Sequence, residues 1–237
     1  MQLPISPRLL ACSRFVAPGD RVADIGCDHG YLGIHLLLGG IASSVIAADV
    51  NEGPLQSAMR NADKYKVRHQ MTFYLSDGVR NIPRDFDVMV CAGMGADTMI
   101  SILEAAPWLR TERYRLILQC QSKTPMLRQY LSETGWRITE ETVLRDGRFL
   151  YTVMQVVWQP DYPRLRIGQY YFPPALLENP APEQPEYYAR LCFSLQRAVT
   201  GRKENADPQM VAALQELQTL TDDPALRWLK EEHHDNG

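Results

Sequence analysis

The stretch VADIGCDHGYL, residues 22–32, decides the fold of this chain. Its first half is a short apolar run that ends on an acid, so residues 21–25 are expected to form a buried strand. A turn containing glycine follows, and the apolar residues after Gly30 predict a helix. Ligands of such strand–turn–helix units bind at the carboxyl end of the strand. The turn carries two carboxylates, Asp24 and Asp28, which is unusual for a turn that must approach a pyrophosphate.

The same alternation recurs along the first two thirds of the chain. Strands are expected at residues 21–25, 44–49, 71–75, 86–92, 114–120, 137–144 and 149–158. Helical patterns lie between most of these strands, and Asp146-Gly147 marks a hairpin between the last two. This order differs from the two mononucleotide halves of nicotinamide-binding proteins and fits the seven-stranded sheet of class I methyltransferases. We therefore expect an α/β, Rossmann-like fold with a mostly parallel sheet and an antiparallel C-terminal hairpin.

The sequence changes character after residue 158. Residues 159–185 hold seven of the chain's 16 prolines and are expected to form a connector with some fixed turns. Residues 187–203 then predict a helix, Asp207-Pro208 starts a second one, and Pro224 starts a short third one. The expected domains are a methyltransferase domain at residues 1–158 and, at 159–237, the proline-rich connector with a small helical, coiled-coil-like domain.

Charge alone does not identify a partner. The net charge is −3, and residues 1–158 hold 17 Lys and Arg against 16 Asp and Glu. A globally basic nucleic-acid-binding surface is therefore not expected, although local clusters can still hold phosphates. Residues 159–237 hold 8 basic and 12 acidic residues, so the helical tail is acidic.

Cysteine usage and hydropathy predict a cytoplasmic protein. Five cysteines are scattered without a CxxC pair, which is typical of core residues in a reducing compartment rather than of disulfides or zinc ligands. No run approaches the roughly 18 apolar residues of a membrane span. The N-terminus lacks the charged-then-apolar order of a secretory signal. We expect no metal and no membrane partner, and the oligomeric state stays open, with a monomer as the expectation.

Acidic residues end the first three predicted strands, at Asp24, Asp49 and Asp77, and an AGMG turn ends the fourth. S-adenosylmethionine carries a sulfonium and an ammonium and no phosphate, so carboxylates near these turns are favourable. Asp49 would accept hydrogen bonds from the ribose hydroxyls, and Asp77 would accept one from the adenine amine. Glycines in these turns allow the ligand to approach the backbone closely. The predicted cofactor-binding residues are Asp24, Gly26, Asp49, Asp77, Gly78, Ala92, Gly93 and Met94.

Each of these aspartates also has a simpler interpretation. A lone aspartate at a strand end is usually a turn or helix cap. Three in register, together with a glycine turn and AGMG, favour the cofactor. A nicotinamide cofactor is disfavoured, because residues 26–30, GCDHG, lack the GxGxxG spacing and put a carboxylate where a pyrophosphate would sit.

The first turn also carries residues that could face the methyl acceptor. The AGMG turn is not the Asn/Asp-Pro-Pro-aromatic motif of enzymes that methylate exocyclic amines, so an acceptor with an exposed lone pair, such as a ring nitrogen, is expected. If adenine N1 attacks, Asp28 could stabilise the developing charge or take a proton from the amine. Tyr31 could stack on a flipped base or pack against the sheet. His29 could act beside Asp28 or remain a solvated or capping imidazole. The predicted catalytic residues are Asp28, His29 and Tyr31.

Five segments resemble the bacterial tRNA (adenine(22)-N1)-methyltransferase family of the TrmK type: ADIGCDHGYLGIHL (23–36), IAADVNEGPLQSA (46–58), SDGV (76–79), AGMG (92–95) and RLILQ (115–119). The pattern DxGxDHxYL is the most specific of these features. The resemblance implies methyl transfer from S-adenosylmethionine to N1 of an adenine in the D-arm region of tRNA, with the helical tail assisting RNA binding. The chain departs from the family pattern at Ala96, where glycine is usual, and at Cys120-Gln121, where Pro-Asn is typical.

These features together predict a cytoplasmic tRNA (adenine-N1)-methyltransferase. Arg8, Lys64, Lys66 and Arg68 are candidate phosphate contacts, suggested by local charge and by the resemblance, although a solvated helix end explains residues 64–68 equally well. Two alternatives stay open. A methyltransferase for a small molecule would need a closed, apolar acceptor pocket, and a non-catalytic module would only bind S-adenosylmethionine or a partner. Of these three hypotheses, only RNA binding predicts an interaction that weakens steeply as salt rises.

Overall fold

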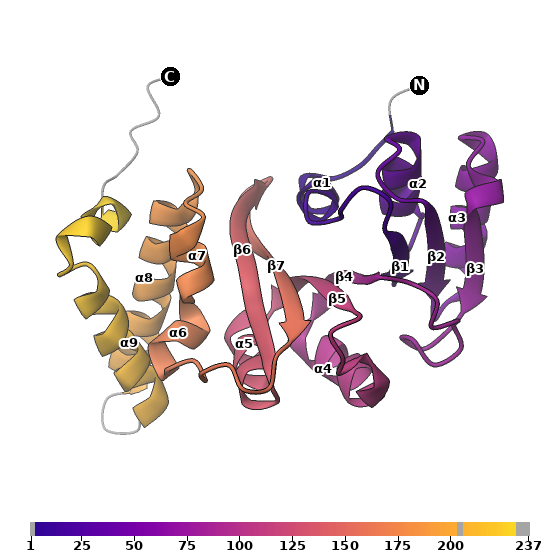
Figure 1. Ribbon diagram of the computed structural model, residues 1–237. Helices are drawn as coiled ribbons and strands as arrows, with labels where there is room; N and C mark the ends of the chain where they lie inside the picture. Colours follow the sequence, from indigo (N-terminus) through magenta and orange to yellow (C-terminus); the bar gives the residue numbers. More distant parts are fainter. Residues whose placement is uncertain (1–2, 203–205, 231–237) are drawn as a thin grey trace, which may run out of the picture.

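The computed structural model describes residues 3–202 and 206–230 and is built around one seven-stranded sheet (Figure 1). The strands lie in the order β3-β2-β1-β4-β5-β7-β6 across the sheet. Neighbours among β1 to β5 are parallel, whereas β7 is antiparallel to both β5 and β6. The strands are β1 Arg21–Ile25, β2 Ser44–Asp49, β3 Met71–Leu75, β4 Val88–Gly95, β5 Arg115–Ser122, β6 Trp136–Asp146 and β7 Phe149–Trp158.

The predicted fold class is confirmed, because the sheet is mostly parallel and ends in an antiparallel hairpin. All seven expected strands are present, with ends displaced by a few residues. β4 starts later than expected and continues to Gly95, since its last residues pair with β5 through a bulge. β6 extends to Asp146, which pairs with Phe149 directly across the hairpin turn.

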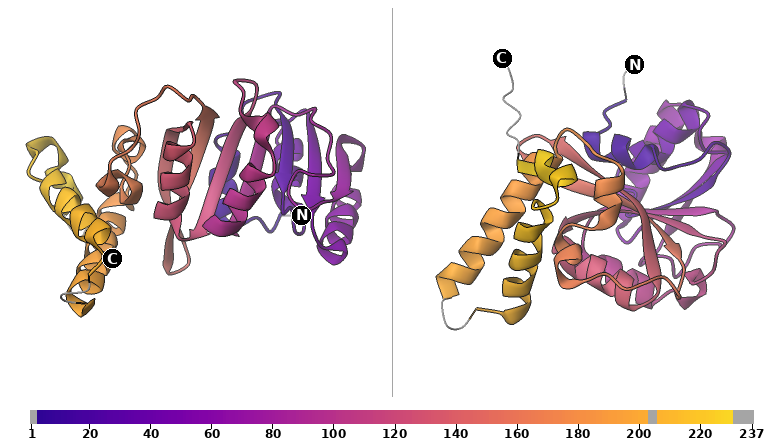
Figure 2. Two further views of the ribbon diagram at one scale, coloured as in Figure 1. Left: turned by 90° about the horizontal axis from the view of Figure 1, so that it is seen from below. Right: turned by 60° about the vertical axis from the view of Figure 1, so that its left-hand side comes forward.

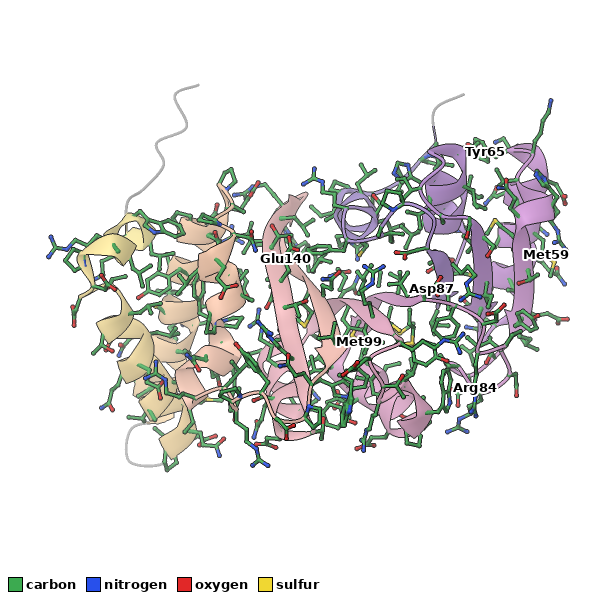
Figure 3. The ribbon with its side chains drawn as sticks, in the orientation of Figure 1. Met59, Tyr65, Arg84, Asp87, Met99 and Glu140 are labelled. Atoms are coloured by element: carbon green, nitrogen blue, oxygen red, sulfur yellow. The ribbon has the colours of Figure 1, made fainter. Side chains whose placement is uncertain are left out.

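Helices cover both faces of the sheet and bury two apolar cores (Figures 1 and 2). Successive side chains of a strand point to opposite faces, so Val22 belongs to one core and Ala23 and Ile25 to the other. The helices of the first face are α1 Pro7–Ser13, α2 Tyr31–Leu38 and α3 Glu52–Lys64, and those of the second are α4 Ala96–Glu104 and α5 Thr124–Glu133. Met99 of α4 lies inside the second core (Figure 3). Short 3₁₀ turns occupy Arg68–Gln70 (η1) and Pro107–Leu109 (η2).

The C-terminal residues form a helical layer beside β6. Its elements are α6 Ile167–Tyr171, α7 Pro174–Glu178, α8 Gln184–Arg202, α9 Pro208–Leu220 and η4 Pro224–Lys230. The two long helices lie side by side (Figure 2), and a third apolar core joins them to Val143 of β6. The predicted division at residue 158 stays a prediction: β7 ends there, yet the helical layer packs on the sheet.

The predicted connector is more regular than its prolines indicated. Residues 159–185 contain α6 and α7, and Pro174 starts α7 because proline is favoured in the first turn of a helix. The helix expected at 187–203 begins earlier, at Gln184, and its expected last residue lies outside the described residues.

A buried ion pair joins the sheet to the helical layer. Neither the Arg128 nor the Glu141 side chain is exposed, and Arg128 Nη2 lies 2.6 Å from Glu141 Oε1. Arg128 Nη1 also donates to the carbonyls of Tyr170 and Tyr171, at 3.0 and 2.7 Å, and Nη2 donates to the Tyr187 hydroxyl at 3.3 Å. One arginine therefore connects α5 and β6 to α6 and α8.

Candidate active site

The turn after β1 contacts the last residues of β4, the AGMG segment that was expected to form a turn and instead belongs to the strand. The amides of Gly26 and Cys27 both donate to the Ala48 carbonyl, at 2.8 and 3.0 Å, which holds this turn against β2. Gly26 has a φ of +73°, and a Cβ atom there would lie 2.2 Å from Cε of Met94. Only glycine fits this position without a shift. Two of the predicted cofactor turns are therefore in direct contact.

Asp49, at the end of β2, holds the same turn from the other side. Its Oδ2 accepts from the Asp28 amide at 3.1 Å, and its Oδ1 accepts from the Asn51 amide at 2.9 Å. Asp28 lies in the left-handed region, with a φ of 50°. Each carboxylate oxygen keeps a second lone pair for a ligand hydroxyl. Asp49 thus both orders the loop and remains able to accept from a ribose.

Asp24, the last polar residue of β1, is a buried acid with an unsatisfied oxygen. Only 4% of the residue is exposed, and its Oδ2 has no hydrogen-bond partner within the described part of the chain. Burial raises the pKa of the Asp24 carboxyl to about 7, and the charge of Asp49 adds to the shift, whereas the Gly33 amide opposes it. Such a carboxylate favours a proton or a cation beside it.

The end of β3 presents a more open arrangement. The Asp77 side chain is largely exposed, with its Oδ2 3.5 Å from Arg80 Nη1. Gly78 has a φ of +58°, and a Cβ atom there would lie 2.9 Å from Cγ1 of Ile102. Val50, next to Asp49, and Leu75, the last residue of β3 and two residues before Asp77, are exposed apolar residues. Sequence reasoning missed both, although their positions near these acids were a usable signal.

The last residues of β4 are fixed by β5. Gly93 has a φ of +83°, and its amide donates to Oε1 of the fully buried Gln119 at 3.1 Å. A Cβ atom on Gly95 would lie 2.8 Å from Oγ of Ser122. Residues at the end of β5 were not predicted as site residues, because a single sequence does not show which strand lies beside β4.

The three predicted catalytic residues lie together on the rim of the first turn. The Asp28 and His29 side chains are both mostly exposed, with Nε2 of His29 3.6 Å from Oδ1 of Asp28. The His29 and Tyr31 rings are 5.7 Å apart. Asn61 of α3 donates to the His29 carbonyl at 3.0 Å and so supports this rim. The arrangement exposes a carboxylate and two rings beside the cofactor turns.

The four predicted phosphate contacts do not lie together. Arg8 Nε donates to Asp146 at 2.7 Å, at the tip of the β6–β7 hairpin, beyond the carboxyl end of β5. Lys64, Lys66 and Arg68 instead lie between α3 and the start of β3, near Tyr65 (Figure 3). They are therefore at the amino ends of the parallel strands, opposite the cofactor turns.

Comparison with known proteins identifies the family. The sequence matches the methyltransferase domain family over residues 5–154, which is more than half of the chain. This protein belongs to the methyltransferase domain family.

A sequence relative indicates which kind of methyltransferase this chain resembles. The chain is 31% identical to the tRNA (adenine(22)-N(1))-methyltransferase of Bacillus subtilis over 154 residues, which are 65% of this chain and 65% of that protein. The match thus spans slightly less than two thirds of that relative's length.

Two solved structures cover more of the chain. Sp1610 of Streptococcus pneumoniae, solved in complex with S-adenosyl-L-methionine, has a TM-score of 0.79 and 28% identity, covering 91% of this chain and 99% of that one. The Bacillus subtilis m1A22 tRNA methyltransferase TrmK has a TM-score of 0.76 and 26% identity, covering 97% and 100%. The predicted family resemblance is confirmed, and it includes the helical layer outside the matched domain.

Two further observations concern the described residues of this methyltransferase. No group of three or more His, Cys, Asp or Glu side chains among them is arranged to hold a metal ion. No helix within residues 3–202 and 206–230 is long and apolar enough to cross a membrane.

Proposed function

We propose that this protein transfers a methyl group from S-adenosylmethionine to N1 of an adenine in tRNA, in the cytoplasm. The observation that carries the proposal is the meeting of Asp24 and Asp49, at the carboxyl ends of β1 and β2, with Gly26 and the Gly93 segment of β4, where Oδ2 of the buried Asp24 has no hydrogen-bond partner among the described residues. The tRNA acceptor follows from the named activity of the Bacillus subtilis relative. Four of the five cysteines are buried and all five are free, which suits a reducing compartment.

The residues present fit S-adenosylmethionine. Asp49 would accept from the ribose hydroxyls, and the exposed Asp77 would accept from the adenine amine. The exposed Val50 would pack against the adenine face. Asp24 offers its unsatisfied oxygen toward the positively charged end of the ligand. When bound, the cofactor supplies an electrophilic methyl group on a sulfonium.

The methyl acceptor must be held in position, and its nucleophilic nitrogen needs little activation. N1 of an unpaired adenine exposes a lone pair, so holding it in line with the methyl group supplies most of the catalysis. The purine gains positive charge as N1 attacks, and the exposed Asp28 carboxylate lies on the rim where it can stabilise that charge. Tyr31, with His29 beside it, offers a ring on which the extruded base can stack.

The direct test is methylation of tRNA. The full-length protein is incubated with labelled S-adenosylmethionine and unmodified bulk tRNA, and the product is mapped by primer extension, which stops at N1-methyladenine. We expect label in tRNA and a stop at an adenine. Unlabelled tRNA, or a stop at another base, would contradict the proposal.

A binding measurement accompanies this assay. Asp49→Ala removes the ribose acceptor and frees two loop amides, so the affinity for S-adenosylmethionine should fall at least about tenfold by calorimetry. Asp63→Ala, an exposed acid at the end of α3, is the matched control and should bind normally. Normal binding by Asp49→Ala would overturn the site assignment.

A further inference from the structure

The end of β5 places an unused amide beside the last residues of β4. Gln121 is exposed, and its side chain makes no hydrogen bond to any described residue. Its Nε2 lies 3.6 Å from the point that a Cβ atom on Gly93 would occupy. From β5, the buried Gln119 binds the Gly93 amide and Ser122 lies against Gly95, whereas the amide of Gln121 faces Gly93 without a partner among the described residues.

The backbone around Gln121 is held on both sides. The buried Gln119 accepts from the Gly93 amide at 3.1 Å and donates from Nε2 to the Cys120 carbonyl at 3.2 Å. On either side of Gln121, Cys120 pairs with Met94 and Ser122 pairs with Gly95 of β4. These pairs fix the backbone of residue 121, while its side chain makes no hydrogen bond to a described residue.

The hydrogen-bond donors and acceptor of a glutamine amide match those on one edge of adenine. It offers one acceptor and two donors, and glutamine pairs in bidentate fashion with the N6 amine and N7 of adenine. If N1 is aimed at the methyl group, N6 lies next to it and N7 lies on the far side of N6. Guanine carries an acceptor oxygen in place of the amine, so the same amide would not match it.

We propose that Gln121 selects the acceptor base by accepting a hydrogen bond from the adenine N6 amine through Oε1 and donating one to N7 through Nε2. This inference rests on the proposed function. In the transfer, the N1 lone pair forms the new N–C bond while the C–S bond breaks and its electron pair stays on sulfur. The positive charge then resides on the purine and its amine, which keeps its protons. The hydrogen bond from that amine to Oε1 of Gln121 strengthens as positive charge develops on the purine. It therefore stabilises the transition state more than the bound substrate.

The test combines a protein variant with a modified base. Gln121→Ala and the apolar Gln121→Met are compared with wild type on the tRNA that wild type methylates, carrying either adenine or 7-deazaadenine at the mapped position. We expect both variants to lower kcat/KM on the adenine substrate by roughly 10-fold to 100-fold. On 7-deazaadenine, which lacks N7, the ratio of the wild-type kcat/KM to that of either variant should be at least about fivefold smaller than on adenine.

Three controls make the outcomes decisive. The affinity for S-adenosylmethionine and the Tm should stay at wild-type values, because Gln121 is exposed, and Gln129→Ala on α5 should methylate normally. Wild-type rates for Gln121→Ala, equal losses on both substrates, or a matching loss of cofactor affinity would overturn the inference. A wild-type protein that labels no tRNA would overturn the proposed function and this inference together, whereas an active wild type with an equally active Gln121→Ala would overturn only the inference.

Discussion

Asp24 shows how one buried acid couples stability to pH. Its pKa in the folded protein, about 7, is above the ordinary value of 3.8, because burial disfavours the charged form. The folded state therefore binds more protons than the unfolded state between about pH 4 and pH 7. The contribution of Asp24 lowers the free energy of unfolding as pH rises through this window, by at most about 4 kcal/mol.

Replacing Asp24 with asparagine should remove that pH dependence. Asp24→Asn is expected to be more stable than wild type at pH 8 and of similar stability at pH 4, as measured by urea unfolding at both values. If the oxygen of Asp24 accepts the positively charged end of the cofactor, the same variant should bind S-adenosylmethionine more weakly at pH 8. A variant that is less stable than wild type at pH 8 would show that Asp24 is satisfied in the native protein.

Gly26 gives a second prediction at the residue scale. Alanine there would be strained by its φ of +73° and would meet Met94, so Gly26→Ala should lower the free energy of unfolding by roughly 2 kcal/mol or more and weaken cofactor binding. Gly53→Ala is the matched control, because a Cβ atom there meets nothing within 4 Å. Adding Met94→Ala to Gly26→Ala should recover part of the loss. If the free energy of unfolding does not recover, the loss in Gly26→Ala comes from the strained backbone alone.

Some residues of the candidate site could be predicted from the sequence, and others could not. Asp24 and Asp49 were predictable because parallel strands bring their carboxyl ends to one edge. The hydrogen bonds from the Asp28 and Asn51 amides to Asp49, which accompany its proposed role as a ribose acceptor, could not be predicted from the sequence. Gln119 was missed because its role depends on β5 lying beside β4, and strand order across a sheet is set by long-range packing.

At the scale of elements, the buried Arg128–Glu141 pair should be far more important for stability than an exposed pair. Glu141→Gln leaves a fully buried guanidinium without its counter-charge, and we expect a loss of about 3–5 kcal/mol in the free energy of unfolding. Glu186→Gln, which weakens exposed contacts to Arg145 and Arg190, should cost less than about 1 kcal/mol. Urea unfolding of both variants measures the difference, and equal losses would contradict it.

A double replacement tests what the pair contributes. Arg128→Met with Glu141→Leu removes both charges, so it should be much more stable than Glu141→Gln alone. It also removes the bonds from Arg128 to the Tyr170 and Tyr171 carbonyls, which end α6. Faster amide exchange of α6 in the double variant, with an intact sheet, would identify the pair as the link between the two layers.

Elements were predictable where apolar periodicity was strong. The parallel strands were expected close to their observed ends, because each is a short apolar run between turn residues. The segment 159–185 was not, since its prolines mask two short helices that have little periodicity of their own. α6 depends on Arg128 for its last carbonyls, and that contact spans more than 40 residues of sequence.

At the scale of the whole molecule, basic residues lie on two opposite edges. Arg148 follows the tip of the β6–β7 hairpin, and Arg190 of α8 donates to its carbonyl at 3.3 Å. The exposed Phe149 lies beside them. Lys64 and Lys66 lie next to β3, at the amino ends of the strands and six strand spacings from β6, which is about 29 Å across the sheet. We expect an RNA strand that delivers a base to the predicted cofactor-binding residues to pass Arg148 and Arg190 and not to reach Lys64 and Lys66.

Matched double variants separate these edges. Arg148→Ala with Arg190→Ala should weaken tRNA binding and reduce the slope of log K against log salt by about 1 to 2, because each lost phosphate contact removes roughly 0.7 to 0.9 from it. Lys64→Ala with Lys66→Ala also removes two charges and should leave both affinity and slope unchanged. Filter binding at several salt concentrations measures both quantities. The opposite ranking would mean that the tRNA wraps around the amino edge of the sheet, and that Lys64, Lys66 and Arg68 contact its phosphates after all.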